Sequence, residues 1–263
     1  MENTLTFEKP SIFKRLKGML SVDFYRLFHT PMFYIFLAIA ALIPALVSMG
    51  GGFSDNAWNI IAADSPLYVV NDIGEYANMN MVFIFGGIMI SIFIGHDYKS
   101  GYVKQLFTTH SKKQDYIISK SLVGAFSMAC MCITYLIGGV IAGAGSGLSF
   151  EVNAGSLIIA ILGKMIMSLG WASLYAFLNI ILRKFFGISI AASFALGTGI
   201  IIIGAAAVVG NSPVLNIFLY GSSVYACLSA NIGTLFVCLA CSFVWAVIYN
   251  AVGTLILNKS DVY

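Results

Sequence analysis

Apolar residues occur along the chain in long, nearly unbroken runs, and short polar segments separate one run from the next. The runs are about 17–25 residues long, and polar and apolar positions do not alternate within them. About 20 apolar residues form a helix that spans the ~30 Å hydrocarbon core of a bilayer, whereas the strands of a membrane barrel alternate. The pattern therefore predicts an all-α integral membrane protein.

The runs predict six transmembrane helices in a single membrane domain that covers residues 1–263. Pro213 lacks a backbone donor, so we expect the fifth helix to end near Val209. Residues 213–230 would then form a short re-entrant segment before the last span or lie along the outer surface; a further full crossing would move the C-terminus to the other side. The predicted spans are residues 32–50, 78–95, 120–145, 157–182, 186–209 and 233–257.

Composition excludes an ordinary soluble enzyme. Only 10% of the 263 residues are charged and 59% are hydrophobic, whereas a soluble domain carries roughly 25% charged residues. Five cysteines are present, and the pair Cys238 and Cys241 has the spacing of some redox or metal motifs. No histidine or second pair lies nearby, so we interpret the cysteines as small apolar packing residues.

Lysine and arginine are placed almost entirely on one side of the predicted membrane. Thirteen of the 14 basic residues lie in the first thirty residues, in the loops after the second and fourth spans, or in the tail. The three opposite loops contain only acidic charges, which are Asp55, Asp64, Asp72, Glu75 and Glu151. The positive-inside rule predicts that both termini and the basic loops are cytoplasmic.

Lys164 is the exception, because it lies within the fourth predicted span, near its outer edge. Its long stem can carry the ammonium group to the outer interface. Alternatively, the charge lines a transport pathway.

Two polar segments have amphipathic character. Residues 11–30 have helical periodicity with one apolar and one basic face, which predicts a helix in the membrane surface that ends before Pro31. Residues 95–120 gather five lysines, but Val103, Leu106 and Phe107 are interleaved with them. The second segment is either a basic loop that sets topology or a short helix that docks on a partner.

The order of these elements resembles the permeases of type-2 ATP-binding cassette exporters. That family has six spans, cytoplasmic termini, an amphipathic elbow helix before the first span, a coupling helix after the second, and a re-entrant segment before the sixth. The residues that carry the local resemblance are Asp97, Gly101, Lys104, Leu106, Lys112, Lys113, Tyr116, Ile117, Ser119 and Lys120.

The resemblance implies a second permease, identical or homologous, and a cytoplasmic ATPase dimer that supplies the energy. The residues expected to contact the ATPase are Gly101, Tyr102, Val103, Lys104, Leu106 and Phe107. ATP and Mg²⁺ would bind in the partner, because the only Gly-Lys pair here, Gly163-Lys164, lacks the glycine-rich loop that holds phosphate. We expect no catalytic, cofactor or metal site in this chain, and no nucleic-acid partner.

The spans contain few charges, so a transport pathway would suit hydrophobic or amphipathic cargo such as a peptide, an antibiotic or a lipid. An antimicrobial peptide and the cell membrane of a bacterium would fit this interpretation. An ion-coupled carrier is an alternative, although such carriers usually place charged relays inside their spans. A membrane scaffold or sensor that transports nothing is another.

Several in-span residues are candidates for helix packing. Gly139, Gly143 and Gly147 share one face at a spacing of four residues and allow a close approach of backbones. We also expect Pro44 to kink the first span. Three polar residues are expected to form hydrogen bonds between helices, namely Asn179, Thr198 and Asn250.

Overall fold

The computed structural model describes residues 11–49, 81–108, 112–145, 154–198, 217–228 and 232–259. Within them, every regular element is a helix. In chain order these are α1 (Ile12–Phe28), α2 (Pro31–Met49), α4 (Met81–Lys99), α5 (Tyr102–Thr108), α6 (Lys113–Gly145), α7 (Ala154–Ile181), α8 (Phe186–Gly197), α10 (Leu219–Leu228) and α11 (Ile232–Lys259).

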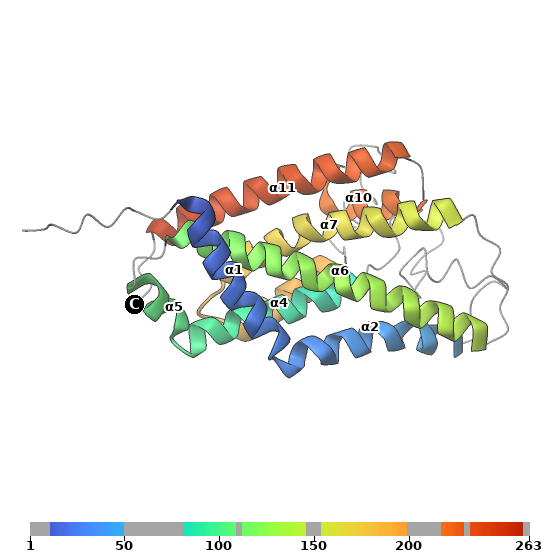
Figure 1. Cartoon of the computed structure of the whole chain (residues 1–263), viewed down its shortest axis with the longest axis horizontal. Coiled ribbons are helices and arrows are strands. Elements are labelled where there is room, and N and C mark those ends of the chain that lie inside the picture. The colour runs from blue at the N-terminus through green and yellow to red at the C-terminus, as the bar shows by residue number, and fades with distance from the viewer. Residues whose placement is uncertain are drawn as a thin grey trace, which may run out of the picture.

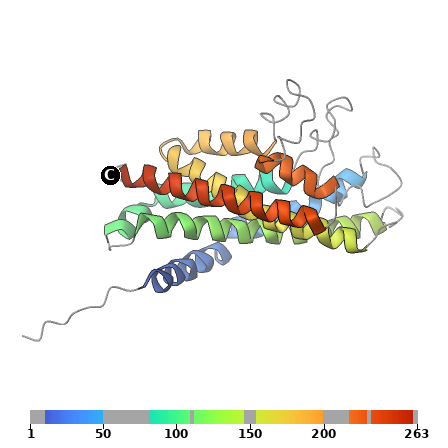
Figure 2. The ribbon, with the colours of Figure 1, turned by 90° about the horizontal axis from the view of Figure 1, so that it is seen from above.

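The long helices form an elongated bundle whose helices run along one axis, as Figure 1 shows. α7 packs along α6 and α11, α2 packs on α6, and α8 packs mainly on α4. Figure 2 shows α1 on one side of this bundle and α8 on the other. α4 and α11 end, and α6 and α8 begin, at the same end of the bundle, where α5 also lies. We call it the basic end.

The apolar composition makes this a multi-pass membrane protein. Among the described residues, four helices are long and apolar enough to cross a bilayer, or five spans are present if α1 and α2, which are bent by 65°, are taken as one. Each of the six predicted spans contains one described helix, but α8 has only 12 residues and the rest of that span lies outside the described residues. The count of six therefore stays a prediction.

The corner between α1 and α2 has a local origin. Ser11 caps α1 by accepting a hydrogen bond from the Lys14 amide at 3.4 Å. Thr30 donates to the Arg26 carbonyl at 2.6 Å, and Pro31 then occupies the first position of α2, where its missing amide costs nothing. The predicted end of the first helix before Pro31 is thus confirmed.

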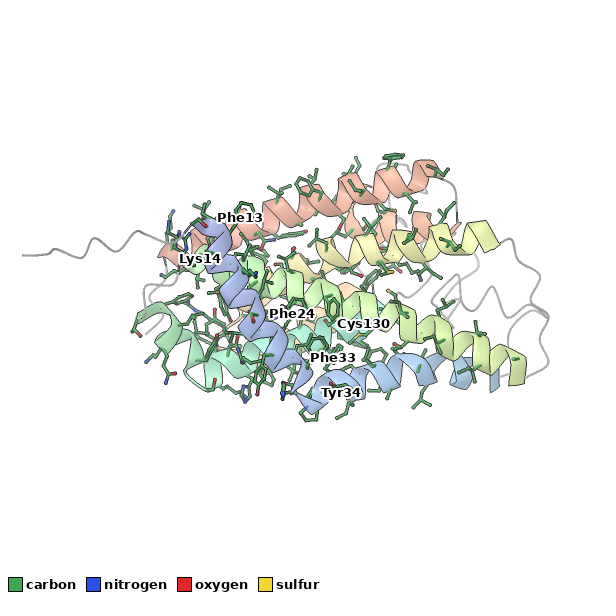
Figure 3. All side chains as sticks on the ribbon, in the orientation of Figure 1. Phe13, Lys14, Phe24, Phe33, Tyr34 and Cys130 are labelled. Carbon is green, nitrogen blue, oxygen red and sulfur yellow. The ribbon has the colours of Figure 1, made fainter. Side chains whose placement is uncertain are left out.

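Aromatic rings pack this corner onto α6. The Phe24 and Phe126 ring centroids are 5.1 Å apart, and those of Phe28 and Phe33 are 5.7 Å apart, both edge to face. Figure 3 labels Phe24 and Phe33 on the two helices that meet at the corner. Such pairs fix the crossing of α1 over the bundle more firmly than aliphatic contacts of equal area.

Two asparagines, Asn179 and the partly buried Asn250, hold the bundle together away from its ends. Asn179 donates to Ser91 at 3.0 Å and accepts from Ser189, which joins α7 to α4 and α8. Asn250 accepts from Ser121 at 2.9 Å and donates to Ser173 at 3.1 Å, which joins α11 to α6 and α7. Both asparagines therefore bond between helices as predicted.

Thr198 differs from these asparagines, because its hydroxyl donates to the Ala195 carbonyl of its own helix. Of the three polar residues predicted to bond between helices, the two asparagines do so, and Thr198 bonds within its own segment. The side chain of Pro44 lies outside the described part of the chain.

Candidate functional site

Four charged side chains meet inside the basic end of the bundle. Asp23 and Arg26 come from α1, Asp97 from the last turn of α4, and Lys120 from α6. The Lys120 ammonium lies 2.6 Å from Asp23 and 2.7 Å from Asp97, and the Arg26 guanidinium pairs with Asp97 and lies 3.6 Å from Asp23. We call these four residues the charge cluster.

Burial makes this arrangement energetically demanding. Asp97 is 0% exposed, Asp23 1% and Lys120 2%. Isolated charges cost several kcal/mol each when they leave water, so such groups are stable only when they are paired and hydrogen-bonded. Two acids and two bases balance here, so the cluster carries no net charge.

Hydroxyl groups satisfy the remaining lone pairs of the carboxylates. Ser119 donates to Asp23 at 2.6 Å, and Tyr116 donates to Asp97 at 3.2 Å. Each buried carboxylate therefore has both cationic and neutral donors, as a stable buried ion requires. Asp97 is thus bound by side chains from both α1 and α6.

Aromatic rings enclose the two cations. The Arg26 guanidinium lies 4.3 Å from the centre of the Tyr102 ring, and the Lys120 ammonium lies 4.4 Å from that of Phe93. Such cation–π contacts are strongest when water is excluded. Burial raises the pKa of the Tyr102 phenol, and the Asp23 carboxylate raises it further, so Tyr102 is neutral at physiological pH.

A tight turn attaches the cluster to α5. Gly101 follows α4 and has φ of 72°, the left-handed region that side chains with a Cβ rarely adopt. Its amide donates to the Tyr98 carbonyl at 3.3 Å, and α5 then begins at Tyr102. Asp97 therefore lies one short turn away from α5, and a displacement of α5 acts on the cluster directly.

Gly101→Ala is expected to lower the free energy of unfolding by about 1–2 kcal/mol, because alanine pays the left-handed backbone penalty. Thermal unfolding of the purified protein would measure the loss. Gly187→Ala is the matched control, since nothing lies within 4 Å of a Cβ at either position but Gly187 has no left-handed φ. Equal unfolding midpoints for both variants would contradict the turn assignment.

α5 has one face turned toward the bundle and one face exposed. Val103 is 1% exposed and packs with Met19, Tyr116 and Leu257, and Leu106 and Phe107 pack partly against the same group. The exposed side chains of α5 are Lys104, Gln105 and Thr108.

This orientation changes how the six predicted contact residues are interpreted. Val103 is covered by its own chain, and Leu106 and Phe107 are partly covered, so these three residues hold α5 against the bundle. Gly101 and Tyr102 form the turn and the edge of the charge cluster. Lys104 alone among the six is on the open face.

Lys164 lies in α7 and is only 6% exposed. Both interpretations of Lys164, a residue that reaches the outer interface and a charge that lines a transport pathway, stay predictions. Gly139 is buried in α6, whereas Gly147 and the surroundings of Gly143 lie outside the described residues.

The close helix approach involves the neighbouring Gly138. A Cβ at this position would lie 2.8 Å from the Ala41 Cα of α2 and nearer still to the Ala41 carbonyl oxygen. No group of three or more potential metal ligands occurs among the described side chains. The glycine contact and the charge cluster thus lie at two different places along α6.

Sequence reasoning missed most of the charge cluster. In the sequence, Lys120 stands among the lysines of residues 95–120 and Arg26 on the basic face of residues 11–30. Asp97 carries only the family resemblance, and nothing in the charge pattern singles out Asp23. A usable signal exists in retrospect, because Met19, Asp23 and Leu27 recur every four residues, which places an acid in an apolar stripe.

A family model described as ABC-2 family transporter protein matches residues 19–204. The chain belongs to this family. The match begins inside α1, ends beyond α8, and includes all four residues of the charge cluster together with α5. No curated protein matches the chain as a relative. As an ABC-2 membrane component, the chain takes part in transport, and families of this kind generally carry no ATPase site of their own.

Proposed function

We propose that this chain is the permease subunit of an ATP-binding cassette exporter and that a separate ATPase dimer acts on it through α5. The observation that carries the proposal is the charge cluster, which ties α1, α4 and α6 together beside Tyr102, the first residue of α5. A helix meant only to be solvated would need no such buried anchorage.

The contacts around α5 provide a mechanical route into the bundle. Gly101 connects α5 to α4 without a flexible linker. Near the end of α4, Gly95 contacts the ring of Phe186 so closely that a Cβ would overlap it, and the Lys99 ammonium lies 4.1 Å from the centre of the same ring. Movement of α5 therefore acts on α4 directly and on α8 through Phe186.

The open face of α5 is the proposed ATPase contact. Lys104, Gln105 and Thr108 present one cation and two hydrogen-bonding groups, while the apolar side chains of α5 face the bundle. This polarity suits a partner surface with acidic or amide side chains. ATP and Mg²⁺ bind in the partner, and none is expected in this chain.

The remaining parts of the proposal rest on the charge pattern and on the family to which the chain belongs. The basic end faces the cytoplasm, so both termini do as well, in the cell membrane of a bacterium. A second permease, identical or homologous, completes the transporter. The described spans bury few charges outside the cluster, which supports export of a hydrophobic or amphipathic compound such as a peptide, an antibiotic or a lipid.

The test uses a double variant of the open face, Lys104→Glu with Gln105→Glu. We expect the ATPase to bind roughly tenfold more weakly, or about 1.4 kcal/mol, while the permease unfolds at the wild-type temperature. Co-purification with titrated ATPase measures the first effect and thermal unfolding the second. Replacing Leu106 or Phe107 would be less informative, because both also pack on the bundle.

Lys17→Glu provides the control, since Lys17 is an exposed lysine on α1 with no part in α5. It should leave ATPase binding unchanged. If the double variant binds the ATPase with wild-type affinity and still couples hydrolysis to transport, α5 is not the contact.

A further inference from the structure

A groove of about 550 Å³ runs between α6 and α11, apart from the charge cluster. Ile118 and Leu122 line it from α6, and Val247, Ala251 and Leu255 line it from α11. α11 is the least buried of the four candidate spans, with 17% of its apolar window covered by the rest of the chain. The groove is therefore open to the hydrocarbon of the bilayer.

The α11 wall of the groove ends in a cation. Phe243, Val247, Ala251 and Leu255 recur every four residues, and the next position of the same stripe is Lys259, in the last turn of α11. Lys259 is exposed. The groove is thus mostly apolar, and the stripe that forms its α11 wall leads to a lysine at the basic end of the bundle.

The acidic side chain in the first turn of α6 is already paired. Asp115 is 3% exposed and pairs with Arg15 at 2.9 Å. On the α6 wall, Gln114 is exposed and is the last lining residue before the basic end. The cation at this end of the α11 stripe is therefore Lys259.

Polar groups in the floor of the groove are already satisfied within the chain. Ser121 donates to Asn250, Asn250 donates to Ser173, and Thr254 donates to the Asn250 carbonyl at 2.7 Å. An occupant need not supply hydrogen bonds there, so a purely apolar chain can bind without leaving buried polar groups unpaired.

The dimensions favour a chain thinner than a helix. Packed helices have axes about 8–10 Å apart, whereas a helix with side chains is about 10–12 Å wide. α6 and α11 are in direct contact, so a third helix can lie across the furrow between them but cannot enter it. A single acyl chain can enter.

We propose that this groove binds a phospholipid with an anionic headgroup, with one acyl chain between α6 and α11 and the phosphate beside Lys259. The apolar stripe recognises the chain and the terminal lysine recognises the charge. A basic residue near an anionic headgroup contributes about 1 kcal/mol, so Lys259 accounts for a roughly fivefold preference for anionic over zwitterionic lipid.

The experiment uses the full chain in lipid nanodiscs that contain a photoactivatable phosphatidylglycerol or a phosphatidylcholine with the same acyl chains. We expect mass spectrometry to find crosslinks in residues 114–122 and 243–255, roughly fivefold more with phosphatidylglycerol. Ala251→Trp should abolish most of this labelling. Val252→Trp is its control, because Val252 is exposed on α11 but does not line the groove.

A second pair of variants tests the headgroup. Lys259→Gln should remove the preference for phosphatidylglycerol, and Lys184→Gln, an exposed lysine at the same end, should preserve it. Labelling spread evenly over exposed α11 positions, or labelling unaffected by Ala251→Trp, would contradict binding of the acyl chain in the groove. Equal labelling of the wild-type protein by the two lipids would overturn the proposed preference for an anionic headgroup. If neither lipid labels the groove, a second copy of the chain rather than a lipid covers it, and the proposal is wrong.

Discussion

Lys120→Met is expected to destabilise the protein by about 3–5 kcal/mol, the usual cost of removing one partner from a buried ion pair. The variant leaves Asp23 and Asp97, which are 1% and 0% exposed, with Arg26 as the single cation of the cluster. Methionine retains most of the volume, so the loss reports charge rather than packing. The unfolding midpoint of the detergent-purified protein measures it.

Lys112→Met and a double variant separate the effect of burial from that of charge. Lys112 is exposed at the start of the same helix, so its replacement should change the midpoint little. Adding Asp23→Asn to Lys120→Met restores the balance of one acid and one base and should recover part of the stability. If Lys120→Met and Lys112→Met unfolded at the same temperature, the charge cluster would not contribute to the stability of the protein.

Gly138→Val is expected to be the second most damaging change, at about 1–3 kcal/mol or more, because overpacking a tight contact forces the surrounding structure to move. At Gly138 the obstacle is the backbone of Ala41, which has no rotamer by which to move aside. α2 and α6 would have to separate. Loss of transport activity and a lower unfolding midpoint are the expected observations.

Gly145→Val is the matched control on the same helix, since nothing lies within 4 Å of a Cβ there. Valine has a higher helix propensity than glycine, so this change should be neutral or slightly stabilising. If both glycine variants proved equally stable, the contact between α2 and α6 would not depend on a missing side chain.

Apolar runs made the helices predictable, because crossing a bilayer imposes a length that few other constraints override. α2 begins at Pro31 and α11 begins at Ile232, each one residue from its predicted start. α6 begins at Lys113, seven residues before the predicted start of the third span at residue 120, because the helix continues into the lysine-rich segment. Charge marks the end of a span only when the charge reaches water.

The charge cluster itself was beyond sequence reasoning. Its members are 71 and 97 residues apart along the chain in the pairs Arg26–Asp97 and Asp23–Lys120, and no local pattern reports such a contact. The sequence also does not determine which face of α5 contacts the bundle, since Val103 and Leu106 are equally suited to a partner or to the chain's own core. The glycine run pointed to close packing on α6, but Gly138 lies one residue outside its register.

The residues of the charge cluster are synthesised at different times. Asp23, Arg26 and Asp97 are all made before Lys120, so the nascent protein has two acids and one base of the cluster until the start of α6 is made. At about 5–20 residues per second, Asp23 waits roughly 5–20 s for its lysine. The charge cluster can therefore form only after the start of α6 has been made, however early α1 and α4 are in place.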